Sequence, residues 1–217
     1  MTLIYLVRHG ETDWNRQRRI QGSTDIPLNE TGRSQAAATG QLLGRRDWDA
    51  IYASPLVRAF ETAQIIAREL ELAEPTPLPL VMERQYGEAE GLDWEEVDAR
   101  FPGDTDVPGR ETREEVVARV VPAILETAAQ HPGESILVVS HGGVIRAVLG
   151  SVDPHTTHGT ITNGSVHSFR LVEGTLELIA FNDPIEELSL DEGAADIEEQ
   201  NAIEGRDADE EARPLHH

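Results

Sequence analysis

Two short apolar runs in this chain end in the same way, in a histidine followed by glycine. Residues 4–7 lead into Arg8-His9-Gly10, and residues 135–140 lead into His141-Gly142-Gly143. Runs this rich in Ile, Leu and Val are typical of buried strands. In an open α/β sheet, ligands bind at the carboxyl edge of the strands, and glycine lets the backbone approach a ligand closely there. The two runs therefore predict an α/β fold that presents two imidazoles and one guanidinium at one edge.

Helical patterns and strand-like segments alternate through the rest of the chain. We expect helices at 31–43, 55–72, 112–125 and 142–149, and further strands at 50–53, 77–81, 166–172 and 175–182. Strands that alternate with helices predict a three-layer α/β/α fold, with a mostly parallel central sheet covered on both faces. Glu173-Gly174 separates the last two strands and indicates a hairpin, which predicts an antiparallel edge.

Two further charged groups follow short strand-like segments. Arg58 lies near the start of a predicted helix, where backbone N–H groups favour anions. Pro55 suits the first turn of that helix, because its missing N–H costs nothing there. Glu83 follows the segment at 77–81. Each of these charged residues alone is typical of a solvated surface group, and only their joint occurrence with the two histidines indicates a site.

Together these segments resemble the histidine phosphatase superfamily, also called phosphoglycerate mutase-like. The resemblance rests, in the family's order, on RHGET at 8–12 with Asn15, QG at 21–22, SPLVRAFETA at 54–63, ERQYG at 83–87 and SHGG at 140–143. It covers nearly all of residues 1–183. It implies the phosphoglycerate mutase-like version of the α/β/α fold and an enzyme that forms a phosphohistidine. We expect no metal and no cofactor.

The resemblance implies that His9 is the nucleophile and that Glu83 is the proton donor. An imidazole with a free pKa of about 6.5 is largely uncharged near neutral pH, so it can attack phosphorus and split hydrolysis into two easier steps. One carboxyl group can protonate the leaving oxygen and later deprotonate water. Glu83 is preferred over Glu88 and Glu90, because it lies four residues before Gly87 as in the family.

The other predicted site residues bind the phosphoryl group or the rest of the substrate. Arg8 and Arg58 can hold phosphate oxygens through planar guanidinium groups that stay charged, and His141 adds a further donor. As substrate-binding residues we expect Asn15, Gln21, Gly22, Gly142 and Arg110.

Arg110, with Arg113 beside it, is a candidate for substrate discrimination. Many members of the family have a glycine at the position of Arg110. We hypothesise that Arg110 or Arg84 contacts a second anionic group on the substrate, such as a carboxylate. The alternative, a solvated arginine paired with Glu111 or Glu114, stays open.

The reaction itself has three interpretations. Only residues 92–110 lie between Gly91 and the helix start near Glu111, whereas mutases of the family carry a longer segment there. The short form favours a phosphatase that acts on a small phosphorylated metabolite. Gln85-Tyr86-Gly87 is similar to the mutase version of that loop, so a cofactor-dependent phosphoglycerate mutase is the alternative. An inactive relative that only binds phosphorylated ligands is a second alternative.

Composition excludes some classes of partner. The formal net charge is −22 at pH 7, so the chain would repel nucleic acid and anionic membranes. No apolar run is long enough to cross a bilayer, and no signal peptide precedes the first strand, so we expect a cytoplasmic protein. The chain has no cysteine and hence no disulfide. A homodimer stays open.

The chain divides into a histidine phosphatase domain at 1–183 and an acidic tail at 184–217. The tail has twelve Asp or Glu against two Arg and little periodic hydrophobicity, which predicts a disordered or loosely packed segment. Packing of residues 185–190 on the domain is the alternative. Within the domain, His155, His158 and His167 are interpreted as structural rather than as a metal site.

Overall fold

The computed structural model describes residues 1–103 and 105–185, so all of the predicted tail except its first two residues lies outside the described part. The described strands form one sheet in the order β3-β2-β4-β1-β5-β6. Their bounds are β1 Leu3–Arg8, β2 Ala50–Ala53, β3 Thr76–Pro77, β4 Ser135–Ser140, β5 Val166–Val172 and β6 Thr175–Ala180.

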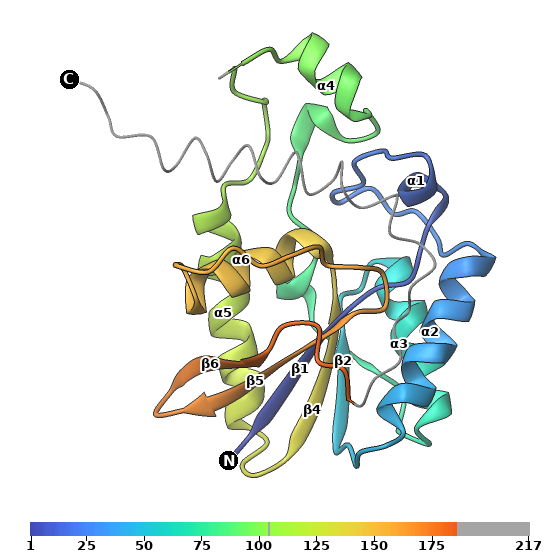
Figure 1. Ribbon diagram of the computed structural model, residues 1–217, viewed down its shortest axis with the longest axis vertical. Helices are drawn as coiled ribbons and strands as arrows, with labels where there is room; N and C mark the ends of the chain where they lie inside the picture. Colours follow the sequence, from blue (N-terminus) through green and yellow to red (C-terminus); the bar gives the residue numbers. More distant parts are fainter. Residues whose placement is uncertain (104, 186–217) are drawn as a thin grey trace.

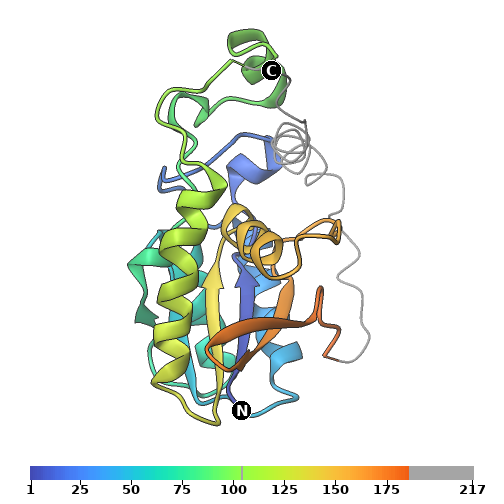
Figure 2. The same cartoon turned by 90° about the vertical axis from the view of Figure 1, so that its left-hand side faces the viewer.

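The sheet is parallel on one side and antiparallel on the other, as predicted. Strand β1 lies at its centre, parallel to β4 with Leu6 opposite Val138, and antiparallel to β5. Strand β2 is parallel to both β4 and β3, whereas β5 and β6 form the antiparallel hairpin. Because β1 and β4 run in the same direction, their histidine-bearing ends meet at one edge of the sheet, as Figure 2 shows.

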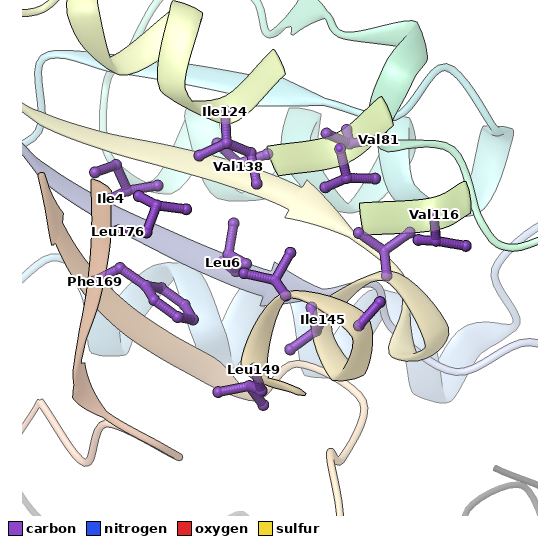
Figure 3. Close-up of a cluster of buried hydrophobic side chains, with 14 of the residues drawn as sticks. Ile4, Leu6, Val81, Val116, Ile124, Val138, Ile145, Leu149, Phe169 and Leu176 are labelled. Atoms are coloured by element: carbon purple, nitrogen blue, oxygen red, sulfur yellow. The ribbon is translucent and has the colours of Figure 1, made fainter. Parts of the chain in front are cut away.

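Helices cover both faces of the sheet, which confirms the three-layer prediction. Helices α2 (Glu30–Leu43) and α3 (Val57–Glu69) lie on one face, and α5 (Arg113–Ala129) and α6 (Gly142–Val152) lie on the other (Figure 1). Successive residues of a strand point to opposite faces. Side chains from β1 and β4 therefore alternate between two buried clusters, and Figure 3 shows the one that packs under α5 and α6, with Ile4, Leu6, Val138, Ile124 and Ile145.

A third, smaller cluster lies beyond the carboxyl edge of the sheet. It joins the buried side chains of Ile20, Tyr86, Ala89, Val97, Phe101 and Val107. Helix α4 (Trp94–Arg100) contributes Val97 to it, and both α4 and the short helix α1 (Asp13–Arg16) extend from the end of the molecule toward which β1 runs (Figures 1 and 2). This cluster fixes the segments at 20 and 86–89 to each other above the strand ends.

The strand predicted at 77–81 is wrong over most of its length. Strand β3 ends at Pro77, and residues Pro79–Val81 form a 3₁₀ turn, η1. Proline has no N–H to donate to a strand ladder, and the segment contains two of them. Only Leu78, between the two prolines, donates its N–H to the carbonyl of Ala53 in β2, at 2.7 Å.

Several helix boundaries also differ from the predictions. Helix α3 begins at Val57, so Pro55 lies before the helix rather than in its first turn. Helices α1 and α4 were not predicted, although a capping box marks the start of each. In α4 the Asp93 carboxylate accepts from the Glu96 N–H, and the Glu96 carboxylate accepts from the Asp93 N–H. A capping box at Thr112 likewise opens α5, whose start at Arg113 agrees with the predicted helix.

The last described residue, Ile185, is a buried anchor. Ile185 is 3% exposed within the cluster under α2 and α3, and its carbonyl accepts a hydrogen bond from Arg45 at 3.3 Å. Residues 186–190, which the alternative for the tail also included, lie outside the described residues. Among the helices that the structure describes, none has the length and apolarity needed to span a membrane.

Candidate active site

His9 leaves β1 at the carboxyl edge and is held by three neighbouring segments. Its backbone N–H donates to Ser140 at 3.0 Å, and its carbonyl accepts from the Asn163 amide at 2.9 Å. Gly10 is required next to it, because a Cβ there would lie 2.2 Å from the carbonyl oxygen of Gly32. The turn after β1 is therefore pressed against the start of α2, and the imidazole is 2% exposed.

The hydrogen bonds of His9 define its tautomer. The Nδ1 atom lies 2.7 Å from the carbonyl oxygen of Gly10, and a carbonyl oxygen can only accept. Nδ1 therefore carries the proton, and Nε2 keeps its lone pair. The pKa of His9 is lowered well below its usual value, first by burial and then by the positive charges of Arg58 and Arg8. The neutral, nucleophilic form of His9 is thus the stable one near neutral pH.

His141 lies beside His9 at the first turn of α6. The two ring centroids are 5.1 Å apart, and His141 is fully buried. Burial, followed by the charge of Arg58, lowers its pKa well below the usual value. Its Nε2 lies 2.8 Å from the hydroxyl of Ser54, whereas its Nδ1 has no hydrogen-bond partner among the described residues. Ser54, which sequence reasoning treated only as part of a motif, thus orients the second imidazole.

Two buried arginines complete the positive side of the cluster. Arg8 donates to the carbonyl of Ile161 at 2.6 Å. Arg58 donates to the carbonyls of Thr24 at 2.9 Å and Gly22 at 2.7 Å. Burial lowers the pKa of Arg58 to about 10, so the group stays charged at neutral pH. Both positive charges contribute to the lowered pKa values of His9 and His141.

Glu83 brings the carboxylate to the same cluster. It is 4% exposed, and its two oxygens accept from the N–H of Arg84 at 2.8 Å and the N–H of Gly143 at 3.3 Å. Gly143 is in the first turn of α6, where the helix dipole favours a negative charge. Glu83 also acts electrostatically on Arg58. The five residues predicted to be catalytic, which come from four separate segments, are therefore brought together.

Arg119 supports the segment that carries Glu83, and sequence reasoning missed it. From α5, it donates to the carbonyls of Leu80 at 2.7 Å and Met82 at 2.8 Å, and its Nε forms an ion pair with Glu111 at 2.6 Å. The sequence could not predict these contacts, because nothing about one arginine on a helix indicates that it binds carbonyl groups 37 and 39 residues earlier in the chain.

The predicted substrate-binding residues fall in different places. The side-chain oxygen of Asn15 accepts from the N–H of Thr12 at 3.0 Å, which leaves its NH₂ group as a donor for a ligand. The side-chain oxygen of Gln21 accepts from the Thr12 hydroxyl at 2.9 Å. Gly142 lies beside Arg8, whose Nε would be 3.4 Å from a Cβ at that position. Arg110 forms an antiparallel β-bridge with Tyr86, which lies three residues after Glu83 in the chain.

The three histidines interpreted as structural lie outside the cluster. His167 is fully buried, accepts from the N–H of Asn182 at its Nδ1, and lies 3.0 Å from the Ser165 hydroxyl at its Nε2. His158 lies 3.4 Å from a carboxylate oxygen of Asp153. The described residues contain no group of His, Asp and Glu arranged to hold a metal ion.

The fold and this cluster describe an α/β protein that gathers two buried histidines, two buried arginines and a buried carboxylate at the carboxyl edge of its sheet. The chain belongs to the histidine phosphatase superfamily, branch 1, whose family model matches residues 4–184.

Named relatives narrow the class further. The chain is 39% identical to the uncharacterized phosphatase PhoE of Bacillus subtilis over 190 residues, which cover 84% of this chain and 95% of that protein. It is 37% identical to the metal-independent phosphoserine phosphatase of Arabidopsis thaliana over 183 residues, 79% of this chain and 77% of that protein. A 2,3-bisphosphoglycerate-dependent phosphoglycerate mutase of Gloeobacter violaceus is 33% identical over 170 residues, 70% of this chain and 76% of that protein.

Solved structures also include phosphatases of similar fold. The mycobacterial glucosyl-3-phosphoglycerate phosphatase in complex with VO₃ superimposes with a TM-score of 0.75 and 29% identity, over 83% of this chain and 98% of that chain. The relatives with higher identity are phosphatases and the mutases are more distant, which supports a phosphatase.

Two glycines of α6 provide a test of how tightly Glu83 is positioned. A Cβ at Gly143 would lie 2.7 Å from Oε1 of Glu83 and 2.9 Å from the Tyr86 hydroxyl, so Gly143→Ala must displace both side chains. A misplacement of about 1 Å costs on the order of 100-fold in rate, so we expect kcat to fall about 10- to 100-fold. Measured kcat and melting temperature separate this effect from unfolding.

Gly150→Ala is the matched control in the same helix. A Cβ at Gly150 meets nothing within 4 Å, so alanine should raise stability by up to about 1 kcal/mol and leave kcat unchanged. Equal kcat values for the two variants would contradict the close placement of Glu83 against α6.

Folding stability should fall in mild acid because of three buried imidazoles. Burial lowers the pKa of His9 and His141 well below normal, and lowers that of His167 to about 3. Below about pH 6.5 the unfolded chain binds protons that the folded chain does not, so stability decreases as pH falls. From pH 6.5 to 5.5 the loss should be about 1 kcal/mol for each histidine.

Urea unfolding between pH 7.5 and 5.5 measures this dependence directly. In His167→Gln the slope of unfolding free energy against pH should be reduced by the contribution of one histidine. A profile that is flat, or that is unchanged in the variant, would mean that these imidazoles accept protons in the folded state.

Proposed function

We propose that this chain hydrolyses small phosphomonoesters through a phosphohistidine on His9. In the first step Nε2 of His9 attacks phosphorus, the P–O bond breaks, and Glu83 gives its proton to the leaving oxygen. In the second step Glu83 takes a proton from water, the water oxygen attacks phosphorus, the P–N bond breaks and inorganic phosphate leaves. The proposal rests on the hydrogen bond from Nδ1 of His9 to the carbonyl oxygen of Gly10. Because this bond places the proton on Nδ1, the lone pair of Nε2 is available to attack phosphorus.

The arginines and His141 stabilise the charge of the transferred group. Phosphoryl transfer spreads charge over equatorial oxygens, so catalysis comes from positioning and electrostatics. Arg8 and Arg58 supply fixed positive charge next to His9, and the buried Nδ1 of His141 is available as a donor when it carries the proton. Asn15, Gly142 and the loop at Gln21 and Gly22 are proposed to border the same oxygens.

The substrate is proposed to carry a second anionic group. Arg84 is 5% exposed, follows Glu83 directly, and donates to the carbonyl of Glu111 at 2.6 Å. Arg110 lies opposite Tyr86, on the same side of the cluster. Two arginines in the segments next to Glu83 suit a carboxylated phosphomonoester, because guanidinium groups bind carboxylates bidentately. A cytoplasmic location, a homodimer and a separate acidic tail remain predictions from the sequence.

Assays on the purified full chain test the reaction. We expect release of inorganic phosphate from p-nitrophenyl phosphate, phosphoserine and 3-phosphoglycerate in the presence of EDTA. Isomerised phosphoglycerate in ³¹P NMR, formed faster than phosphate, would instead identify a mutase. Tight binding of the same esters without turnover would identify a phospho-ligand-binding relative.

Arg110→Ala tests the second anionic group. We expect KM for phosphoserine to rise about 10-fold, the loss of one hydrogen bond to a charged group, while KM for p-nitrophenyl phosphate stays unchanged. Arg100→Ala, an exposed arginine paired with Glu88, is the matched control and should change neither value. Unchanged KM for both esters in Arg110→Ala would remove Arg110 from substrate recognition.

A further inference from the structure

The carboxylate of Glu90 binds a loop that belongs to a distant part of the sequence. Its Oε1 accepts from the N–H of Ser23 at 3.0 Å, and its Oε2 accepts from the N–H of Thr24 at 3.0 Å and from the Thr24 hydroxyl at 2.6 Å. Oε1 also accepts from the N–H of Tyr86 at 3.1 Å. One half-buried carboxylate thus joins the segment that follows α1 to the segment that carries Glu83.

The same loop is held from its other side by Arg58. The guanidinium donates to the carbonyls of Gly22 and Thr24, while the carboxylate of Glu90 accepts from the N–H groups of Ser23 and Thr24. Three consecutive residues are therefore fixed between a cation on their carbonyl side and an anion on their amide side. We call residues 22–24 the bridging loop.

The backbone of the bridging loop is shaped for this contact. Gly22 has φ +53°, and a Cβ there would lie 2.0 Å from Oε1 of Glu90. A side chain at this position would push the carboxylate off the loop. Glu90 in turn is one of three carboxylates that act on the buried charge of Arg58, together with Glu83 and Asp25.

This geometry separates Glu90 from the proton donor. The oxygens of Glu90 bind Ser23 and Thr24 of the bridging loop and the N–H of Tyr86, so its carboxylate is committed to holding these two segments together. Glu88, the other nearby carboxylate, forms an exposed ion pair with Arg100. Glu83 alone of the three accepts from the first turn of α6 beside the two histidines.

We propose that Glu90 is a positioning residue that acts through Arg58. Its carboxylate holds the bridging loop so that the Gly22 and Thr24 carbonyls orient the Arg58 guanidinium toward the phosphoryl group. The inference rests on the proposed function for the identity of the bound group. It assigns Glu90 no contact with the substrate and no part in proton transfer.

Glu90→Gln is the direct test, read out by binding of orthovanadate to the full chain in a calorimeter. An amide has one acceptor oxygen, so its NH₂ group must face the backbone N–H groups of either Ser23 or Thr24. We expect vanadate affinity to fall about 10- to 100-fold, as for the loss of hydrogen bonds to a charged group. Binding needs no turnover, so a failure of the proposed hydrolysis does not affect this readout.

Two companion variants keep the test specific. Glu88→Gln, two residues away and exposed, should bind vanadate like the wild type. Thr24→Val removes only the hydroxyl that lies 2.6 Å from Glu90 and should show a smaller loss in the same direction, even if Glu90→Gln folds poorly.

A double-variant cycle tests whether Glu90 acts through Arg58. In an Arg58→Ala background, Glu90→Gln should lower vanadate affinity by less than about 2-fold, because the group that it orients is gone. Equal losses in both backgrounds would overturn the proposal, as would wild-type affinity in Glu90→Gln. A loss of kcat that appears only with poor leaving groups would also overturn it, because Glu90 would then be the acid.

Discussion

His9→Ala should lower kcat by at least about 10⁴-fold, the largest effect expected of any single replacement in this chain. The variant has no atom that can form the bond to phosphorus, while Arg8, Arg58 and His141 remain to bind the ester. We therefore expect phosphoserine to bind without turnover. Rapid alkaline quench of the wild type with ³²P-labelled substrate should trap a phosphoprotein that is stable in base, labile in acid and absent from the variant.

His155→Ala is the matched control for the nucleophile. This histidine is exposed and follows α6 in the chain, so its loss should leave kcat and the trapped phosphoprotein unchanged. Label that survives in His9→Ala would move the nucleophile to another residue and contradict the mechanism.

Glu83→Gln should produce a loss that depends on the leaving group. Alkyl phosphates such as phosphoserine need protonation of the leaving oxygen, so their phosphoryl transfer should slow about 10²- to 10⁴-fold. p-Nitrophenolate leaves without a proton, so the first step with p-nitrophenyl phosphate should stay fast while hydrolysis of the phosphohistidine becomes slow. Stopped-flow measurements should then show a burst of p-nitrophenol followed by slow turnover.

Glu88→Gln provides the comparison, since its carboxylate lies on the surface and pairs with Arg100. It should show neither a burst nor a dependence on the leaving group. An equal loss in the rate of the first step for both esters in Glu83→Gln would mean that Glu83 positions other groups instead of transferring protons.

The parts that could be predicted from the sequence share a physical origin. Strands β1 and β4 are buried on both faces, so they need continuous apolar runs, and such runs are visible in one sequence. The residues that follow them, His9 and His141, then had to meet, because parallel neighbouring strands end at the same edge. The errors fell where local signals compete, as between Leu78 and Val81, where prolines replace a strand with a turn.

Other features had no local signal. The carboxylates of Glu83, Glu88 and Glu90 lie within eight residues of sequence, and only the family resemblance, through the spacing of Glu83 to Gly87, favoured Glu83. The structure gives each a different partner: the N–H of Gly143, the guanidinium of Arg100, and the bridging loop. Each partner comes from another part of the chain or from a helix that was not predicted.

The sequence by itself determined the layered sheet, the edge that carries the site and the residues with the chemistry for phosphoryl transfer. These follow from apolar periodicity and from residue type, which are properties of short segments. Only the tertiary structure decided the tautomer of His9, the contact of Glu83 with α6 and the division of labour between Glu83 and Glu90. Those depend on hydrogen bonds between segments that are distant in the chain, and such bonds exist only once the chain has packed.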